Sequence, residues 1–227
     1  MASKTSSASA VTPLYPYAAT FHLIDDRGRP PISFLNQLVT WGRKALKDSP
    51  EIFAPNHVAL DAYAAIKSRL ATHKGDDMSD TPVYMWESLL HRAGAMLELM
   101  RVHAGRESSW KPKEGVDKTN KTSISNKVGE EAGIFQVSYN STWLDSVEGK
   151  DIMGAFIKAR GIDTVEKFIA EMKKPEDGMD LEFEYYARLV RVSIAWAGPL
   201  LRHGSDSVYP YLSRDSMREF MSFLETK

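Results

Sequence analysis

The sequence has no cysteine among its 227 residues, so disulfides, thiolate metal sites and cysteine nucleophiles are all excluded. It also has no apolar run approaching the roughly 20 residues needed to span a bilayer, which excludes a membrane-spanning protein. Basic and acidic residues number 29 and 30 and are interspersed, giving a net charge of -1. Nucleic-acid binding that depends on neutralising phosphates therefore has no support.

Motifs for several common chemistries are also missing. The chain has no Gly-x-Gly-x-x-Gly or Walker-type phosphate loop and no Gly-x-Ser-x-Gly nucleophile elbow. No motif in the sequence therefore supports a nucleotide-binding or a serine-hydrolase function. The six histidines include no close pair with metal-ligand spacing. We therefore expect neither a metal nor a cofactor.

The amino-terminal composition disfavours ordered packing. Residues 1 to about 12 are rich in Ser, Ala and Thr, which bury little surface and cannot offset the entropy of ordering the backbone. We assign residues 1–25 to a flexible tail and 26–227 to a single domain. The start contains one lysine, Lys4, and no continuous apolar region, so it does not read as a secretory signal peptide.

Apolar residues recur at helical spacing through most of the remaining chain. The spacing predicts helices over about 32–46, 60–70, 83–104, 152–160, 163–172, 181–197 and 213–224. Asp163 and Glu166 are expected to form a capping box, and Ser213 is expected to cap the last helix. No stretch alternates convincingly between apolar and polar residues, so the sequence predicts a mostly α fold with little or no β.

The most apolar of these segments is the one from about 83 to 104. Its apolar stripe is wide, which predicts a helix buried on more than one side. After Trp110 the helical pattern lapses for roughly 20 mainly polar residues, which is longer than a mere connection usually needs. Long loops of this kind tend to be functional, so we look for a site where the buried helix ends.

Glu107 lies just past this helix, in the run HAGRESSW at 103–110. Burial and the negative end of the helix dipole both disfavour a charged carboxylate, so we expect a raised pKa and a protonated Glu107 near neutral pH. A glycosidase acid needs this state because it donates a proton to the leaving oxygen. His103, on the same helix, is expected to be packed or hydrogen-bonded rather than to be a ligand.

Two segments together resemble the lysozyme-like superfamily, in particular lytic transglycosylases and goose-type lysozymes. They are ESSWKP at 107–112 and GEEAGIFQV at 129–137. In that group a helix ends in a Glu-Ser pair, and a Gly-hydrophobic-hydrophobic-Gln stretch completes the opposite wall of the cleft. The resemblance implies a lysozyme-like helical domain with a long active-site loop, in which Glu107 is the catalytic acid and Gln136 lies across the cleft.

A third segment, AWAGP at 195–199, resembles the transglycosylase helix end that carries Asn-Ala-Gly-Pro. Trp196 stands where the family has Asn, and Tyr209 or Tyr211 would match a later cleft tyrosine. Tyr139, Trp143, Trp196 and Tyr209 are candidates for stacking on sugar rings, although aromatic residues more often belong to the core or its rim. The full set of expected substrate-binding residues is Ser108, Gln136, Ser138, Tyr139, Trp196 and Tyr209.

Hydrolysis also requires a second carboxylate, roughly 6.5 to 9.5 Å from the acid for inversion and roughly 5 to 5.5 Å for retention. Asp117, Glu130 and Glu131 are the candidates. Glu131 is preferred because it adjoins the Ala-Gly-Ile-Phe-Gln stretch, and Asp117 comes second; the alternative for each is an exposed loop charge. Transglycosylases lack this group and let the 6-hydroxyl of the sugar close on the anomeric carbon.

The sequence thus predicts an enzyme that cleaves the β-1,4 bond of an N-acetylhexosamine polymer. The resemblance implies that the polymer is peptidoglycan, and that the enzyme is a muramidase or a lytic transglycosylase acting outside the cytoplasm. Two alternatives stay open: a chitinase or chitosanase on the same scaffold, and a non-catalytic module that binds glycans or proteins. A toxin of this kind would need an inhibitor or immunity protein in its producer.

Overall fold

The computed structural model describes residues 17–53, 88–114, 130–143, 152–174, 179–192 and 211–226. These residues form six α-helices, two 3-10 helices and one two-stranded sheet, which confirms the predicted mostly α fold. The helix expected over 60–70 lies outside the described residues. Within the described ranges, no helix combines the length and the apolar character needed to cross a membrane.

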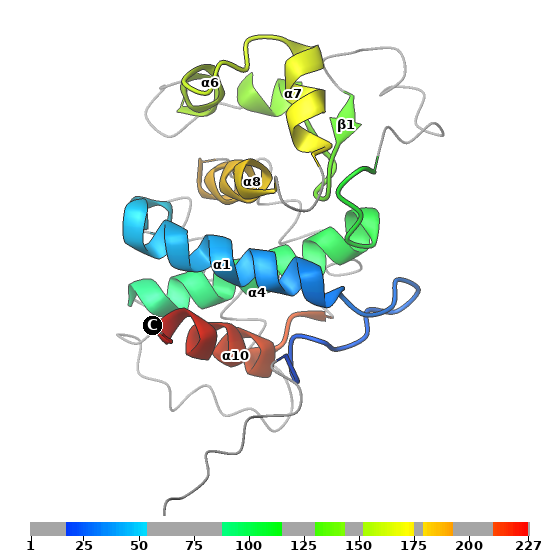
Figure 1. Ribbon diagram of the computed structural model, residues 1–227, viewed down its shortest axis with the longest axis vertical. Coiled ribbons are helices and arrows are strands. Elements are labelled where there is room, and N and C mark those ends of the chain that lie inside the picture. Colours follow the sequence, from blue (N-terminus) through cyan, green and yellow to red (C-terminus); the bar gives the residue numbers. More distant parts are fainter. Residues whose placement is uncertain are drawn as a thin grey trace, which may run out of the picture.

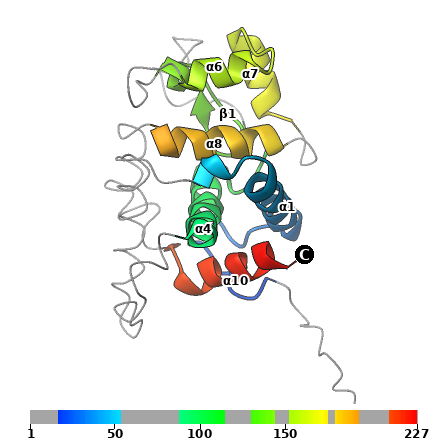
Figure 2. The same cartoon turned by 90° about the vertical axis from the view of Figure 1, so that its left-hand side faces the viewer.

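The helices are stacked in layers. The elements up to the middle of the chain are α1 (Ile32–Asp48), the 3-10 helix η1 (Pro50–Phe53) and α4 (Leu89–Ser108). The later elements are β1 (Glu131–Ala132), β2 (Val137–Ser138), η3 (Tyr139–Trp143), α6 (Ile152–Lys158), α7 (Val165–Met172), α8 (Asp180–Val192) and α10 (Arg214–Glu225). Figures 1 and 2 show α10 on one side of α1 and α4, α8 on the other side, and α6 and α7 beyond α8.

Helix α4 is the most enclosed element, packed against both α1 and α10. All its residues from Arg92 to Gly105 are buried, as the wide apolar stripe predicted. The hydroxyl of Ser88 caps its start by accepting the N–H of His91 at 3.2 Å. The helix continues to Ser108, so Glu107 lies in its last turn and not just past it.

The predicted helix caps are right at one helix and wrong at another. Ser213 caps α10 as expected, because its hydroxyl accepts the N–H of Ser216 at 3.3 Å. The capping box at Asp163 does not form. Instead, Thr164 caps α7 by accepting the N–H of Lys167 at 3.2 Å. The helix begins one residue later than the box requires, and the exposed Asp163 carboxylate forms a 2.7 Å ion pair with the Lys167 amine.

The segment 17–25 is packed, which corrects its assignment to a flexible tail. Tyr17 and Ile24 are buried in the core. The backbone N–H of Thr20 donates to the carboxylate of Glu219 in α10 at 2.6 Å. Apolar side chains in this segment thus offset the entropy of ordering it, and the residues before Tyr17 lie outside the described part of the chain.

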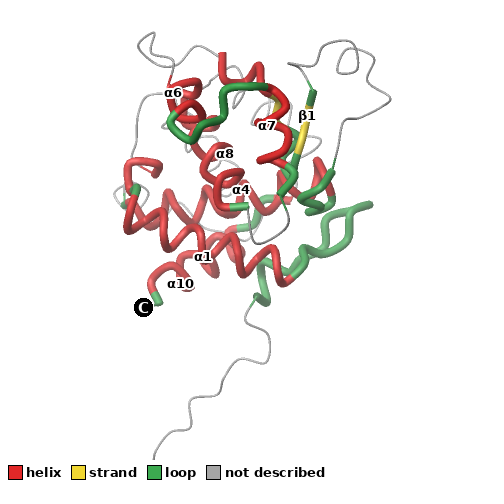
Figure 3. Tube along the Cα trace, turned by 45° about the horizontal axis from the view of Figure 1, so that its top comes forward, coloured by secondary structure: helices red, strands yellow, loops and turns green. Residues whose placement is uncertain are grey.

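The sheet is a short antiparallel hairpin, in which Glu131 pairs with Ser138 and Ala132 pairs with Val137. Ala132 and Val137 are buried, so they fix which face of the hairpin points to the core. The turn between the strands is the Gly-Ile-Phe-Gln stretch, 133–136. Figure 3 shows β1 beside α7, on the same side of the molecule as α6 and away from α10.

Candidate active site

The chain turns sharply where α4 ends. Ser109 and Trp110 have φ angles of 54° and 60°, a left-handed conformation that costs a residue other than glycine roughly 1 to 2 kcal/mol. The buried indole of Trp110 holds the turn, because its Nε1–H donates to the carbonyl of Arg101 at 2.9 Å. Such strained backbone clusters at functional sites, which directs attention to the adjacent Glu107.

Ser108 joins the end of α4 to the hairpin turn. Its buried hydroxyl donates to the carbonyl of Ile134, 26 residues away in sequence, at 2.8 Å. A second bond joins the chain after α4 to the same turn, since the N–H of Gly133 donates to the carbonyl of Glu114 at 3.2 Å. The two segments that carry the resemblance are therefore in direct contact.

Gln136 closes the turn on itself. Its backbone has a φ of 48°, and its side-chain amide donates to the carbonyl of Gly133 at 2.7 Å. The side chain is half-buried, and the turn that it closes is the one that contacts Ser108. The structure thus places Gln136 near the end of α4, with its amide shaping the turn.

A buried glutamate of α8, which the sequence analysis missed, holds the turn from the other side. The carboxylate of Glu182 accepts the N–H groups of Ile134 and of Phe135, the latter at 3.2 Å. Burial raises the pKa of Glu182 well above its ordinary value, although the two N–H donors lower it. A Cβ at Gly133 would overlap this carboxylate and the carbonyl of Met172, so the close approach requires glycine.

Glu107 and His103 lie one helical turn apart on the same face of α4. The Nε2 atom of His103 is 3.2 Å from Oε1 of Glu107. The imidazole is 3% exposed, whereas the Glu107 side chain is 40% exposed. The rings of Phe135 and Tyr186 lie against the imidazole, with centroids 6.2 and 5.2 Å away. The histidine is therefore packed and hydrogen-bonded, as expected, and only the carboxylate reaches solvent.

The expectation of a raised pKa for Glu107 is wrong. Burial is the largest single influence and raises the pKa. The hydrogen bond and charge of His103, followed by the charges of Arg27 and Arg106, lower it by more. The carboxylate of Glu107 is therefore favoured over the protonated acid, because the fold brings a base and two guanidinium groups toward it.

Two predicted site residues, Glu131 and Ser138, lie on the strands of the hairpin. Glu131 and Ser138 are paired across the hairpin and half-buried, on the face opposite Ala132 and Val137. The Ser138 hydroxyl donates to Oδ1 of Asn140 at 2.5 Å. Glu131 thus lies on the hairpin whose turn contacts Ser108, as its position in the sequence suggested.

Two further candidates have partners that favour structural roles. Glu130 forms a 3.8 Å ion pair with Lys173 of the segment after α7. The ring of Tyr139 packs edge-on against Phe168, with centroids 5.6 Å apart, so this tyrosine belongs to the rim of the core.

Three predicted site residues lie outside the described part of the chain: Asp117, Trp196 and Tyr209. Of Trp143, only the backbone is described. Tyr211, the alternative to Tyr209, lies beside the end of α4, because the guanidinium of Arg106 is 5.5 Å from the centre of its ring. Its hydroxyl also donates to Asp25 at 3.4 Å. Tyr211 therefore contacts Arg106, the residue that precedes Glu107 in the last turn of α4.

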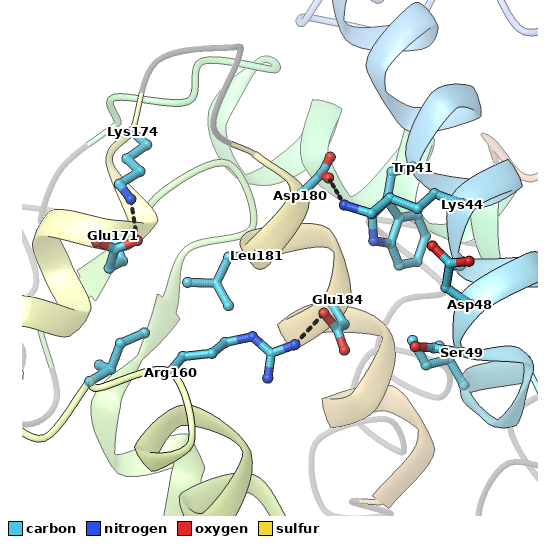
Figure 4. Close-up of a pocket in the computed structure, with 13 residues that line it drawn as sticks. Trp41, Lys44, Asp48, Ser49, Arg160, Glu171, Lys174, Asp180, Leu181 and Glu184 are labelled. Atoms are coloured by element: carbon cyan, nitrogen blue, oxygen red, sulfur yellow. Dashed lines mark hydrogen bonds and ion pairs between the residues drawn. The ribbon is translucent and has the colours of Figure 1, made fainter.

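A separate cavity of about 480 Å³ opens between α1, α7 and α8. Figure 4 shows the ion pairs around it: Lys44 with Asp180, Arg160 with Glu184 and Lys174 with Glu171. None of the predicted site residues lines this cavity. In the described ranges, no group of three or more acidic or histidine side chains is placed to hold a metal ion.

The chain was also compared with known proteins. No protein-family model matches it, and neither a curated protein nor a solved structure is significantly similar to it.

Proposed function

We propose that this protein is a lysozyme-like enzyme that cleaves the β-1,4 bond between N-acetylhexosamines in peptidoglycan, with Glu107 as the proton donor. The observation that carries the proposal is the 2.8 Å bond from Ser108 to the carbonyl of Ile134. It supports the proposal because the Glu-Ser helix end and the Gly-Ile-Phe-Gln turn meet in space, as the two walls of a lysozyme-like cleft do.

The proposed chemistry begins at the exposed side of Glu107. Its carboxyl group donates a proton to the leaving glycosidic oxygen while the bond from that oxygen to the anomeric carbon breaks. The carboxylate that remains is stabilised by His103, Arg27 and Arg106, the groups that lower the pKa of Glu107. Either water or the 6-hydroxyl of the sugar then attacks the anomeric carbon.

The choice between water and the 6-hydroxyl depends on a second carboxylate. Glu131 is the proposed base for hydrolysis, because its hairpin adjoins the end of α4 through Ser108 and Ile134. Mass spectrometry of the products separates the two outcomes. Anhydro-sugar ends indicate transglycosylation, and reducing ends heavier by one water indicate hydrolysis.

The first experiment is digestion of purified cell-wall sacculi by the wild type, Glu107→Gln and Glu51→Gln. General acid catalysis contributes about 10²- to 10⁴-fold, so Glu107→Gln should lose about that factor in turnover. Glu51→Gln is the matched control, because Glu51 is 55% exposed and forms an ion pair with Arg188. Wild-type turnover in Glu107→Gln would end the proposal.

A non-catalytic glycan-binding module is the second candidate, and the lowered pKa of Glu107 favours it. A carboxylate that stays ionised binds sugar hydroxyls well but has no proton to donate. Saturable binding of glycan oligomers, without product after long incubation, would support this candidate. Faster turnover of chitin oligomers than of sacculi would instead identify a chitinase.

A further inference from the structure

We propose that His103 and Glu107 form a proton-sharing pair, in which the buried imidazole holds the proton that Glu107 delivers to the glycosidic oxygen. This inference rests on the proposed function, since it names the residue that supplies the acid. His103 does not reach the substrate itself, so it is a positioning residue that acts through Glu107.

The geometry of the pair carries the inference. The Nε2 atom of His103 is within hydrogen-bond distance of Oε1 of Glu107, at 3.2 Å. The imidazole is covered by Phe135 from the hairpin turn and Tyr186 from α8. Because it is 3% exposed and its carboxylate partner is 40% exposed, a proton on Nε2 leaves for the substrate through Glu107.

The charged groups around the pair act on the carboxylate of Glu107. Arg106 from α4 and Arg27 from the segment before α1 both stabilise the carboxylate form of Glu107. Tyr186 stays neutral, because burial and then the charge of Glu107 raise its pKa well above the ordinary value. The Glu107 carboxylate is therefore an unfavourable place for the proton shared by the two residues until a leaving oxygen needs it.

The proposed step balances in protons and charge. The pair begins as imidazolium and carboxylate, and Nε2–H passes its proton to Oε1 of Glu107. The neutral carboxyl then gives this proton to the leaving oxygen as the bond to the anomeric carbon breaks. The pair ends as neutral imidazole and carboxylate, and it regains one proton from water before the next turnover.

His103→Gln separates the proton-holding role from a structural one. The glutamine amide can still donate a hydrogen bond to Glu107 but cannot release a proton. An imidazole ordinarily holds its proton about two pH units higher than a carboxyl group. We therefore expect the alkaline limb of kcat/KM to move down by about one pH unit or more, with at least about a tenfold loss at pH 7. A purely structural role would be rescued by glutamine, and the limb would stay in place.

A second measurement does not depend on activity. In full-length protein labelled with ¹³C at glutamate carboxyl groups, NMR follows the titration of Glu107. The pKa of Glu107 should rise in His103→Gln, because the charge that lowers it is gone while burial remains. His91→Gln is the matched control, since His91 lies at the opposite end of α4. An unchanged Glu107 titration would overturn the inference.

Two outcomes distinguish this inference from the proposed function. If Glu107→Gln is inactive but the alkaline limb does not move in His103→Gln, the proton-sharing pair is refuted, whereas Glu107 remains the proposed proton donor. If Glu107→Gln keeps wild-type activity, the proposed function fails, whatever the NMR titration shows. If His103→Gln does not fold, NMR titration of the wild type still tests the pair. A Glu107 carboxyl that is coupled to His103 should show a second inflection when the imidazole titrates, and a single inflection would overturn the inference.

Discussion

Helix α4 carries two pairs of a basic and an acidic side chain, and the pairs differ in how far the acidic side chain is exposed to solvent. In its middle, Arg101 donates to both carboxylate oxygens of Glu98 at 2.8 Å, and both side chains are buried. In its last turn, His103 is equally buried, but Glu107 is 40% exposed. Both pairs join a base to an acid on one helix face, but only the second has an acid that a substrate can reach.

The middle pair holds the fold together. Glu98 accepts the N–H of Ser213 at 2.7 Å, and Arg101 donates to the carbonyl of Tyr211 at 3.0 Å. These bonds fix the segment that leads into α10 against α4. Burial raises the pKa of Glu98, while Arg101 and the Ser213 N–H lower it. The fully enclosed pair thus connects elements of the fold, whereas the exposure of Glu107 makes the second pair available for chemistry.

Breaking the enclosed pair should have the largest effect on stability. Arg101→Met leaves the Glu98 carboxylate buried without its cation, which typically costs about 3 to 5 kcal/mol. Urea unfolding followed by circular dichroism measures the loss. Glu107→Gln, the corresponding change in the exposed pair, should cost less, because Glu107 is 40% exposed and a glutamine can still form a hydrogen bond with His103. Equal losses in the two variants would remove the distinction between the pairs.

A substitution in the hairpin turn, on the side of the molecule opposite α10, should have a smaller effect on stability than Arg101→Met. Gly133→Ala adds a methyl group that overlaps Glu182 and the Met172 carbonyl, at a backbone φ of 78°. We expect a loss of about 3 kcal/mol from crowding and strain together. Gly161→Ala is the matched control, since its φ is 73° and no atom lies within 4 Å of the added carbon.

The control should therefore lose only about 1 kcal/mol, from the backbone conformation alone. Thermal or urea unfolding of the two variants isolates the crowding at the turn. A loss in Gly133→Ala no greater than in Gly161→Ala would show that Glu182 does not hold the turn tightly.

The helical framework could be predicted from the sequence, and the hairpin could not. The periodicity of the apolar residues indicated α1, α4, α6, α7, α8 and α10, because each buries one face or more. The strands of the hairpin have only two residues each, too few for an alternating pattern. The periodicity of the apolar residues also gives no indication that the helix end contacts the turn.

The site residues show what sequence reasoning can and cannot reach. Glu182 was missed, although its spacing of three or four residues from Met179 and Tyr186 places it on the buried face of α8. The pKa of Glu107 was predicted in the wrong direction. The His103 partner was visible four residues earlier on the same helix. The approach of Arg27 depends on how the segment before α1 folds back, which no local pattern indicates.

The proposed site is where the half-exposed pair of α4 meets the hairpin turn, and not the cavity of Figure 4, where three ion pairs join most of the charged side chains. The most direct test is ¹⁵N NMR titration of inactive Glu107→Gln with a tetrasaccharide of alternating N-acetylglucosamine and N-acetylmuramic acid. The largest shifts should fall on the amides of Ser108, Ile134 and Gln136. Shifts confined to residues around the cavity, such as Lys44 and Asp180, or no shifts at all, would contradict the account.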